Sequence, residues 1–379
     1  MPDFGHKILN KLGFHDHHDQ PQQQQQQQQP PQQQYYPPQQ QYPVHNDERL
    51  LSSHPSGTYP RLTRLSDGSL LSSFTRFSGD GERTLVVAHS RDGHRFEDIG
   101  EVTRGRGDTD NLFLLEAAPN VVLGAFRNHD HGPDGRPTHF RITVCRSQDG
   151  GRTWQFASQA AEKSGADGLG VWEPFMRMGR DGREVQLTYS QELAHNNQCT
   201  MLVRSTDHGS TWSAPVCLHG SDDCRRDGMN GIAPTFDQAR GRDALVMVFE
   251  TNTKGPMQLE GLISYDDGQT WGDRHVVYAP RDGHRHNAGA PQIASFADGT
   301  LAVVFMTDED HEEVQWTKNA CIKAVFGRPP QNGHIDWDHS STLICGESSH
   351  WPGVFGLDGH TVMATYECGG PKARAISLH

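Results

Sequence analysis

The segment SQDGGRTW, from Ser147 to Trp154, recurs along the chain and decides its fold. Further copies are STDHGSTW (Ser205 to Trp212), SYDDGQTW (Ser264 to Trp271) and a shorter one, SRDGHRF, from Ser90. The first serines of the four copies are 57, 58 and 59 residues apart. A repeat period above 50 residues with a fixed turn in each unit indicates an array of similar supersecondary units.

An apolar run precedes each copy: TLVVAHS, RITVCRS, TMLVRS and LISY. These runs predict strands, and the polar segment that follows predicts a hairpin turn, because Asp and Ser bond neighbouring backbone groups and Gly tolerates positive φ. We expect the tryptophan to fold back as a plug between the strands of its own unit. A structural turn explains the repeat better than a ligand site in every copy.

Six segments of the form strand, tight polar turn, strand support the repeat. They span residues 59–74, 111–126, 173–190, 233–250, 290–306 and 351–367, and five contain a proline near the start: Pro60, Pro174, Pro234, Pro291 and Pro352. Six units of about 57 residues, each with four strands, predict an all-β, six-bladed β-propeller over residues 44–379. The sixth unit lacks one strand, and DERLLSSH (47–54) is expected to supply it and close the ring, since an open edge invites aggregation.

The composition limits the remaining possibilities. Residues 1–43 form a leader, rich in Gln and Pro from Asp19 to Tyr42, that we expect to be disordered. The sequence shows no signal peptide and no membrane span, which predicts a cytoplasmic location, with non-classical export left open.

A net charge of −13 without a basic block argues against nucleic acid as a partner, and we expect a monomer. Seven cysteines without a C-x-x-C pair predict free thiols in a reducing compartment, and the scattered histidines predict no metal site and no cofactor.

The repeated turns are Asp-boxes, and the six hairpins resemble the sialidase superfamily of six-bladed propellers. Within it, the segments YPRL (59–62), WEPFM (172–176), NGIAPTF (230–236), VFET (248–251) and NAGAPQI (287–293) are most similar to glycoside hydrolase family 93. This resemblance implies an inverting exo-α-L-1,5-arabinanase that releases arabinobiose from the non-reducing end of arabinan. Asp-boxes lie away from the active site in that superfamily, so they indicate the fold and not the function.

Propeller geometry places the start of each first strand and the end of each second strand at one mouth of the central channel. Glu173 starts the third hairpin and Glu250 ends the fourth, both in apolar surroundings (VWEPF and MVFET) that raise the pKa of a carboxyl group. Glycoside hydrolysis needs two carboxyl groups, about 6.5–9.5 Å apart in inverting enzymes. These two also match the family's catalytic pair, and we assign Glu173 as acid and Glu250 as base, an order that the sequence does not determine. The alternative is that each glutamate only pairs with an arginine.

Substrate-binding candidates at the same mouth are Arg61, Trp172, Asn252, Asn287, Trp351 and Tyr366. The tryptophans suit stacking on sugar rings, and the amides suit hydroxyl recognition, although both kinds of residue also serve as packing. The expected partner is an oligosaccharide or polysaccharide.

Two alternative functions stay open. A sialidase would use Tyr366 as nucleophile with Glu250 and Arg61, but two further arginines of the implied carboxylate-binding triad do not appear, which favours a neutral sugar. A non-catalytic propeller that binds a glycan or a protein is the second alternative.

Overall fold

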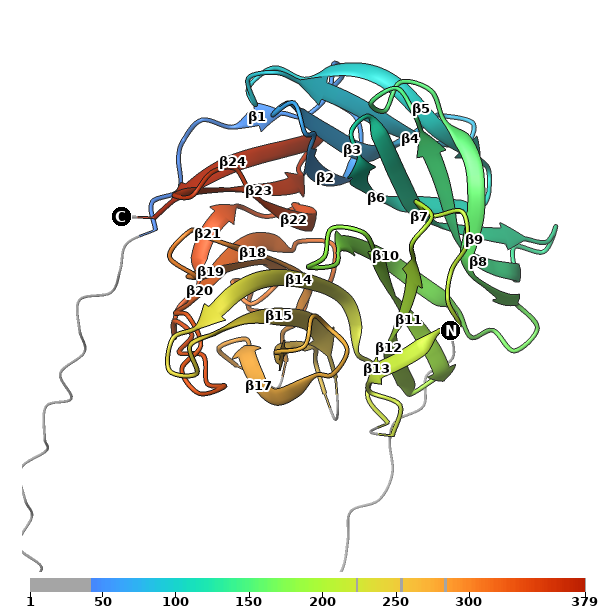
Figure 1. Ribbon diagram of the computed structural model, residues 1–379. Helices are drawn as coiled ribbons and strands as arrows, with labels where there is room; N and C mark the ends of the chain where they lie inside the picture. Colours follow the sequence, from blue (N-terminus) through green and yellow to red (C-terminus); the bar gives the residue numbers. More distant parts are fainter. Residues whose placement is uncertain (1–41, 223, 253–254, 283–284, 379) are drawn as a thin grey trace, which may run out of the picture. The chain divides into compact units, whose positions relative to one another are not determined.

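The computed structural model describes residues 42–222, 224–252, 255–282 and 285–378. The secondary-structure elements in these ranges are all β-strands. The strands form six four-stranded antiparallel sheets, or blades, that follow one another around a ring (Figure 1). The predicted all-β, six-bladed propeller is confirmed. The compact unit comprises Gln41–His379, and the predicted leader falls almost wholly outside the described residues.

Five blades are built from consecutive strands. Blade one contains β2 (Thr58–Arg64), β3 (Leu70–Phe77), β4 (Arg83–Ser90) and β5 (Glu97–Gly105), and blade two contains β6 (Asp108–Ala118), β7 (Val121–His131), β8 (Pro137–Ser147) and β9 (Gln155–Ser164). Blade three contains β10 (Val171–Met178), β11 (Val185–Ala194), β12 (Asn197–Ser205) and β13 (Val216–His219). Blade four contains β14 (Gly228–Asp237), β15 (Arg242–Thr251), β16 (Gln258–Ser264) and β17 (Gly272–Tyr278), and blade five contains β18 (Ala288–Ser295), β19 (Leu301–Thr307), β20 (Cys321–Gly327) and β21 (Thr342–Cys345). The six predicted hairpins are therefore the first two strands of each blade.

Blade six joins the two ends of the propeller. It contains β22 (His350–Gly356), β23 (Thr361–Glu367) and β24 (Pro371–Ser377), and β1 (Arg49–Leu50) pairs with β24 as its outer strand (Figure 1). The Glu48 carboxylate, next to β1, accepts a 2.8 Å hydrogen bond from the Tyr366 hydroxyl and lies 2.8 Å from the Lys372 ammonium. The predicted closure by residues 47–54 is confirmed.

The Asp-box is a hairpin turn held by one carboxylate. Asp149 accepts hydrogen bonds from the Ser147 hydroxyl (2.7 Å), the Thr153 hydroxyl (2.6 Å) and the backbone N–H groups of Arg152 and Thr153. Burial opposes ionisation of Asp149, but these hydrogen bonds outweigh it and lower the pKa to about 2. The copies that start at Ser205 and Ser264 repeat the same bonds.

The tryptophan of each box packs between neighbouring blades. Trp154 donates its indole N–H to the Gly151 carbonyl at 2.9 Å, and its ring lies against a cluster that includes Leu71 of blade one and Val122 of blade two. The ring lies against Gly124 of its own blade, as predicted, but the prediction missed that the box also reaches blade one, where Gly151 lies against Leu71. The turn projects beyond its own sheet, so the box meets the neighbouring blade as well.

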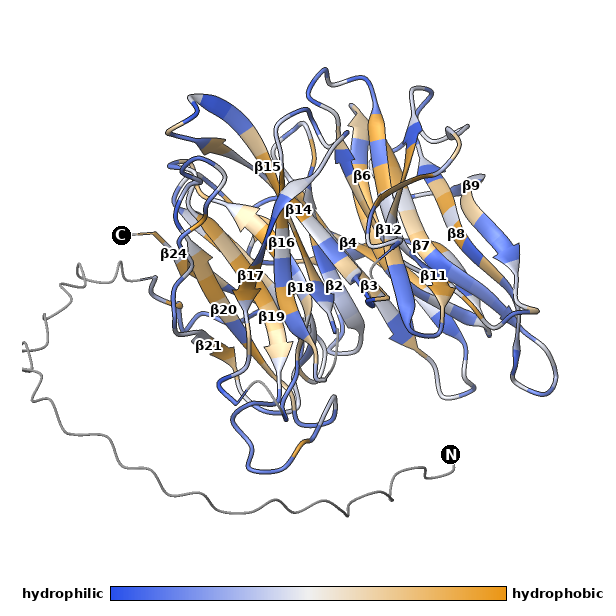
Figure 2. Cartoon of the chain, turned by 90° about the horizontal axis from the view of Figure 1, so that it is seen from below, coloured by the Kyte–Doolittle hydropathy of each residue, from blue (hydrophilic) through white to orange (hydrophobic). Residues whose placement is uncertain are grey.

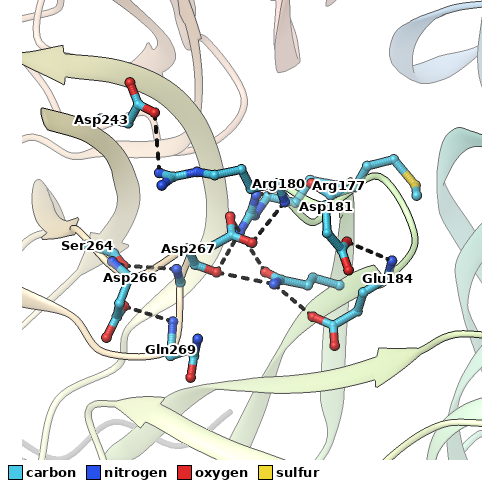
Figure 3. A network of polar contacts seen from close by, with 12 residues as sticks. Arg177, Arg180, Asp181, Glu184, Asp243, Ser264, Asp266, Asp267 and Gln269 are labelled. Atoms are coloured by element: carbon cyan, nitrogen blue, oxygen red, sulfur yellow. Dashed lines mark hydrogen bonds and ion pairs between the residues drawn. The ribbon is translucent and has the colours of Figure 1, made fainter.

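The box of blade four also carries polar bonds to blade three (Figure 3). The Asp267 carboxylate accepts a hydrogen bond from Arg177 at 2.6 Å and one from the backbone N–H of Arg180 at 2.8 Å. Arg177 in turn donates to the Gln186 side chain at 2.8 Å. Asp267, at a position where the other two full-length boxes have Gly150 or His208, thus connects two blades on the face of the propeller opposite the channel mouth.

Hydrophobic residues follow the strands and hydrophilic residues occupy the loops at both ends (Figure 2). All seven residues of β19 are buried, as expected for a sheet covered on both faces. None of the described stretches forms a helix suited to crossing a membrane, and they contain no group of three or more His, Cys, Asp or Glu side chains suited to a metal. The seven cysteines, all described, are free thiols.

Candidate active site

Each blade has a β-bulge at the same place in its first strand. The pairing with the second strand shifts register there, and a residue other than glycine adopts positive φ. These residues are Tyr59 (φ 52°), Asn111 (59°), Glu173 (37°), Met229 (50°), Ala290 (50°) and Trp351 (49°), which we call the bulge ring. Positive φ is costly outside glycine, and bulges redirect side chains near functional sites. The bulge ring therefore identifies this end of the channel as the candidate site.

The bulges also correct one detail of the sequence repeat. A proline directly follows the bulge residue in four blades, at Pro60, Pro174, Pro291 and Pro352. In blade four this position is Asn230, whereas Pro234 lies further along β14. Pro234 is not part of the repeat, although its spacing matched by chance.

A cavity of about 650 Å³ opens beside the bulge ring, and we call it the mouth cavity. Its walls include Tyr59 and Trp351, whose rings stack with centroids 4.7 Å apart at 23°. Arg127 and Glu367 lie at its polar side. An aromatic pair beside charged groups is an arrangement suited to a polar ligand with one apolar face.

Arg127 connects the mouth cavity to Glu173. Its guanidinium lies 3.0 Å from the Asp108 carboxylate, 3.8 Å from the Asp110 carboxylate and 3.6 Å from the Glu173 carboxyl group. Arg83 lies 3.1 Å from the same carboxylate oxygen of Asp110. Both arginines of the cavity are thus already neutralised by carboxylates of blade two.

Burial perturbs the pKa of both predicted glutamates. Burial raises the pKa of Glu173, the Arg127 charge lowers it, and the Glu250 charge raises it further, with a net value of about 8. Its side chain as a whole is 17% exposed. Glu173 is a bulge residue and Glu250 is bonded to another bulge residue, Ala290, so both belong to this end of the channel, although neither lines the mouth cavity.

The Glu250 carboxyl group is held by a backbone hydrogen bond, whereas Glu173 faces the Arg127 guanidinium. Glu250 accepts this 2.7 Å hydrogen bond from the backbone N–H of the bulge residue Ala290. Burial raises the pKa of Glu250, while this hydrogen bond and the charge of Arg226 lower it. The net result is a raised pKa for Glu250, because burial outweighs the hydrogen bond and the Arg226 charge.

Comparison with known proteins gives structural relatives only. No family model and no curated sequence matches the chain. The GH93 α-L-arabinofuranosidase of Fusarium graminearum, solved with arabinobiose, is similar with a TM-score of 0.61 and 18% identity, over 88% of this chain and 98% of that one. The Penicillium chrysogenum α-L-arabinanase, also solved with arabinobiose, gives 0.58 and 16%, over 89% and 98%. A mutant of the NanB sialidase from Streptococcus pneumoniae gives 0.55 and 12%, over 89% and 71%.

The fold is that of a sialidase-like propeller. At these identities the likeness concerns the fold, and the role of each side chain must be argued from the geometry of this chain.

Several predicted binding residues of this sialidase-like propeller lie near the two glutamates without lining the mouth cavity. Trp172 is half-buried, with its ring centroid 5.0 Å from that of His129 and with the Arg127 guanidinium 5.5 Å from its own. Asn287 accepts the backbone N–H of Met257 at 3.0 Å and so orders a neighbouring loop. Asn252 is partly exposed directly after β15, beside residues outside the described ranges.

Two other candidates lie elsewhere. Tyr366 is fully buried, its hydroxyl donates to Glu48 in the ring closure, and, like Glu173 and Glu250, it is not among the residues that line the mouth cavity. A nucleophilic role for Tyr366 would require this hydrogen bond to be broken. Arg61 is buried in the channel below the bulge ring, and Trp351 is the one binding candidate among the described residues that lines the mouth cavity.

The sequence analysis missed Trp316, in the loop between β19 and β20. A side chain at Gly289 would come within 2.7 Å of the Glu250 carboxyl group and 3.1 Å of the Trp316 ring, so both lie against the same glycine. Trp316 is partly exposed and has the flat apolar surface that sugar rings require. Its position in the sequence could have indicated this role, because the loop after the second strand of a blade lies at the channel mouth.

Proposed function

We propose that this protein is a glycoside hydrolase in which Glu173 is the general acid and Glu250 the general base. The observation that carries the proposal is the different surroundings of the two buried carboxyl groups: Glu173 has a raised pKa of about 8, and Glu250 accepts a 2.7 Å hydrogen bond from the backbone N–H of the bulge residue Ala290. A carboxyl group that stays protonated near neutral pH suits the acid, and a carboxyl group whose charged form a backbone N–H donor stabilises suits the base.

In the proposed reaction Glu173 donates its proton to the glycosidic oxygen as the bond to the anomeric carbon breaks. Glu250 removes a proton from a water molecule that attacks that carbon from the opposite face, which inverts its configuration. The Ala290 N–H bond favours the charged form of Glu250. The Arg127 ion pair orients Glu173 without fully ionising it.

The proposed substrate is a neutral glycan, most specifically an α-1,5-linked arabinan attacked from its end. The arginines of the mouth cavity are already paired with Asp108 and Asp110, so neither is free to bind a sugar carboxylate. The stacked rings of Tyr59 and Trp351 supply an apolar surface for a sugar. Two structural relatives were solved with arabinobiose, which supports the same class of ligand.

The test is product analysis on linear arabinan and on a sialoside, with the wild type, Glu173→Gln and Glu250→Gln. The matched control is Glu116→Gln, because Glu116 lies at the far turns, where it accepts the backbone N–H of Ser66. We expect the wild type and the control to cleave arabinan only, and each site variant to lose about 10²–10⁴-fold in kcat. Cleavage of the sialoside alone, or full activity in both site variants, contradicts the proposal. Binding of arabinan without turnover by the folded wild type means that the propeller is a binding protein.

A further inference from the structure

A second, smaller cavity lies deeper in the central channel. It has a volume of about 230 Å³ and is lined by residues from the first strands of all six blades, among them Arg61, Phe113, Phe175 and Gln292. These four occupy the same register position, two residues after the bulge residue of their blade. We call it the channel cavity, and it lies one level below the bulge ring, away from Glu173 and Glu250.

Arg61 is the one charged residue among the described side chains that line the channel cavity. It is 6% exposed, and its Nη1 group donates to the backbone carbonyls of Pro60 at 2.9 Å and Trp351 at 3.3 Å. Within the described ranges no carboxylate lies within ion-pairing distance of it, in contrast to Arg127 at the mouth. Buried charges are normally paired, so Arg61 is an exception that requires a counter-ion.

The surroundings exclude an internal counter-ion. Tyr59 is the ionisable side chain whose charge would act on Arg61, and burial raises the pKa of Tyr59 far above neutral, so its hydroxyl is uncharged. Burial lowers the pKa of Arg61 to about 10, which still leaves the guanidinium charged at pH 7. A guanidinium has five N–H donors, and the two backbone bonds use only Nη1. Nε and Nη2 therefore remain for a ligand.

We propose that the channel cavity binds a small inorganic anion of the halide class, chloride under ordinary conditions, against Nε and Nη2 of Arg61. The cavity has the volume of about eight water molecules, and its remaining walls are mostly apolar, so it offers a charged donor to an anion but few partners for the hydroxyl groups of a sugar. The anion would also fix Arg61, whose Nη1 holds the backbone carbonyl of Trp351. It thereby supports the ring that forms one wall of the mouth cavity.

The first test measures the melting temperature in sodium chloride and in sodium gluconate at equal ionic strength. Chloride at about 100 times its Kd is expected to raise the wild-type melting temperature by about 4 °C. The Arg61→Gln variant is expected to have the same melting temperature in both salts. Arg64→Gln is the matched control, because Arg64 lies on the same strand but is exposed, and it is expected to retain the wild-type response.

The second test needs no variant. Crystals of the wild type soaked in sodium bromide are expected to show an anomalous peak within hydrogen-bonding distance of the Arg61 guanidinium. Only water at that position overturns the proposal, and so does an Arg61→Gln variant that keeps the wild-type chloride response. If Arg61→Gln does not fold, the bromide map alone decides. Neither test uses turnover, so the result is independent of the proposed hydrolase activity.

Discussion

Replacing Glu173 by glutamine is expected to stabilise the protein, increasingly so as the pH rises. The folded-state pKa of Glu173, about 8, lies above its ordinary value of 4.5. Its contribution to stability is therefore complete below pH 4.5 and is lost as the pH rises through 8. This displacement corresponds to about 5 kcal/mol at most. Since 17% of the side chain is exposed, water reduces the cost, and we expect Glu173→Gln to gain about 2–3 kcal/mol at pH 8.

The assay is urea unfolding of both proteins at several pH values between 4.5 and 8.5. The difference in unfolding free energy is expected to be near zero at pH 4.5 and to level off above pH 8. Arg127 keeps Asp108 and Asp110 as partners in the variant, so the loss of Glu173 leaves no unpaired cation. Glu116→Gln serves as the control and is expected to show no such rise. A difference that stays constant with pH, or a variant less stable at pH 8, refutes the reasoning.

Three further changes test the scaffold by thermal or urea unfolding. Asp149→Ala removes the acceptor that holds an Asp-box turn and is expected to cost about 1–3 kcal/mol; an unchanged midpoint shows that the turn does not depend on its carboxylate. Glu48→Gln weakens the ring closure at Tyr366 and is expected to cost about 1–3 kcal/mol, with early loss of protection from hydrogen exchange in β24; protection lost first in another blade contradicts this. Asp267→Asn removes a charge partner of Arg177 and is expected to lower the midpoint at low salt more than at 1 M salt; equal losses show that charge is not involved (Figure 3).

Most of the fold was predictable because the propeller repeats local signals. The Asp-boxes and hairpins carry turn residues and apolar runs whose spacing gives the number of blades, and the missing strand of blade six indicated closure by residues 47–54. The box tryptophans show the limit of this reasoning. Whether Trp154 packs within its own sheet or against the next one depends on how the blades sit side by side, which no local pattern contains.

The candidate site was predictable in position but not in detail. Glu173 and Glu250 follow from propeller topology, since strand starts and returns share one mouth. The bulge ring could not be foreseen, because positive φ at Tyr59 or Met229 has no sequence signature as glycine does. Tyr366 shows the opposite error: its place at a strand end suggested the mouth, but its hydroxyl is engaged by Glu48.

The most direct test of the central assignment compares leaving groups. Glu173→Gln should lose about 10²–10⁴-fold in kcat on linear arabinan but little on a 2,4-dinitrophenyl arabinobioside, whose leaving group needs no proton. Glu250→Gln should lose activity on both substrates. If Glu173→Gln is equally impaired on both, Glu173 does not donate the proton and the account of the two glutamates fails.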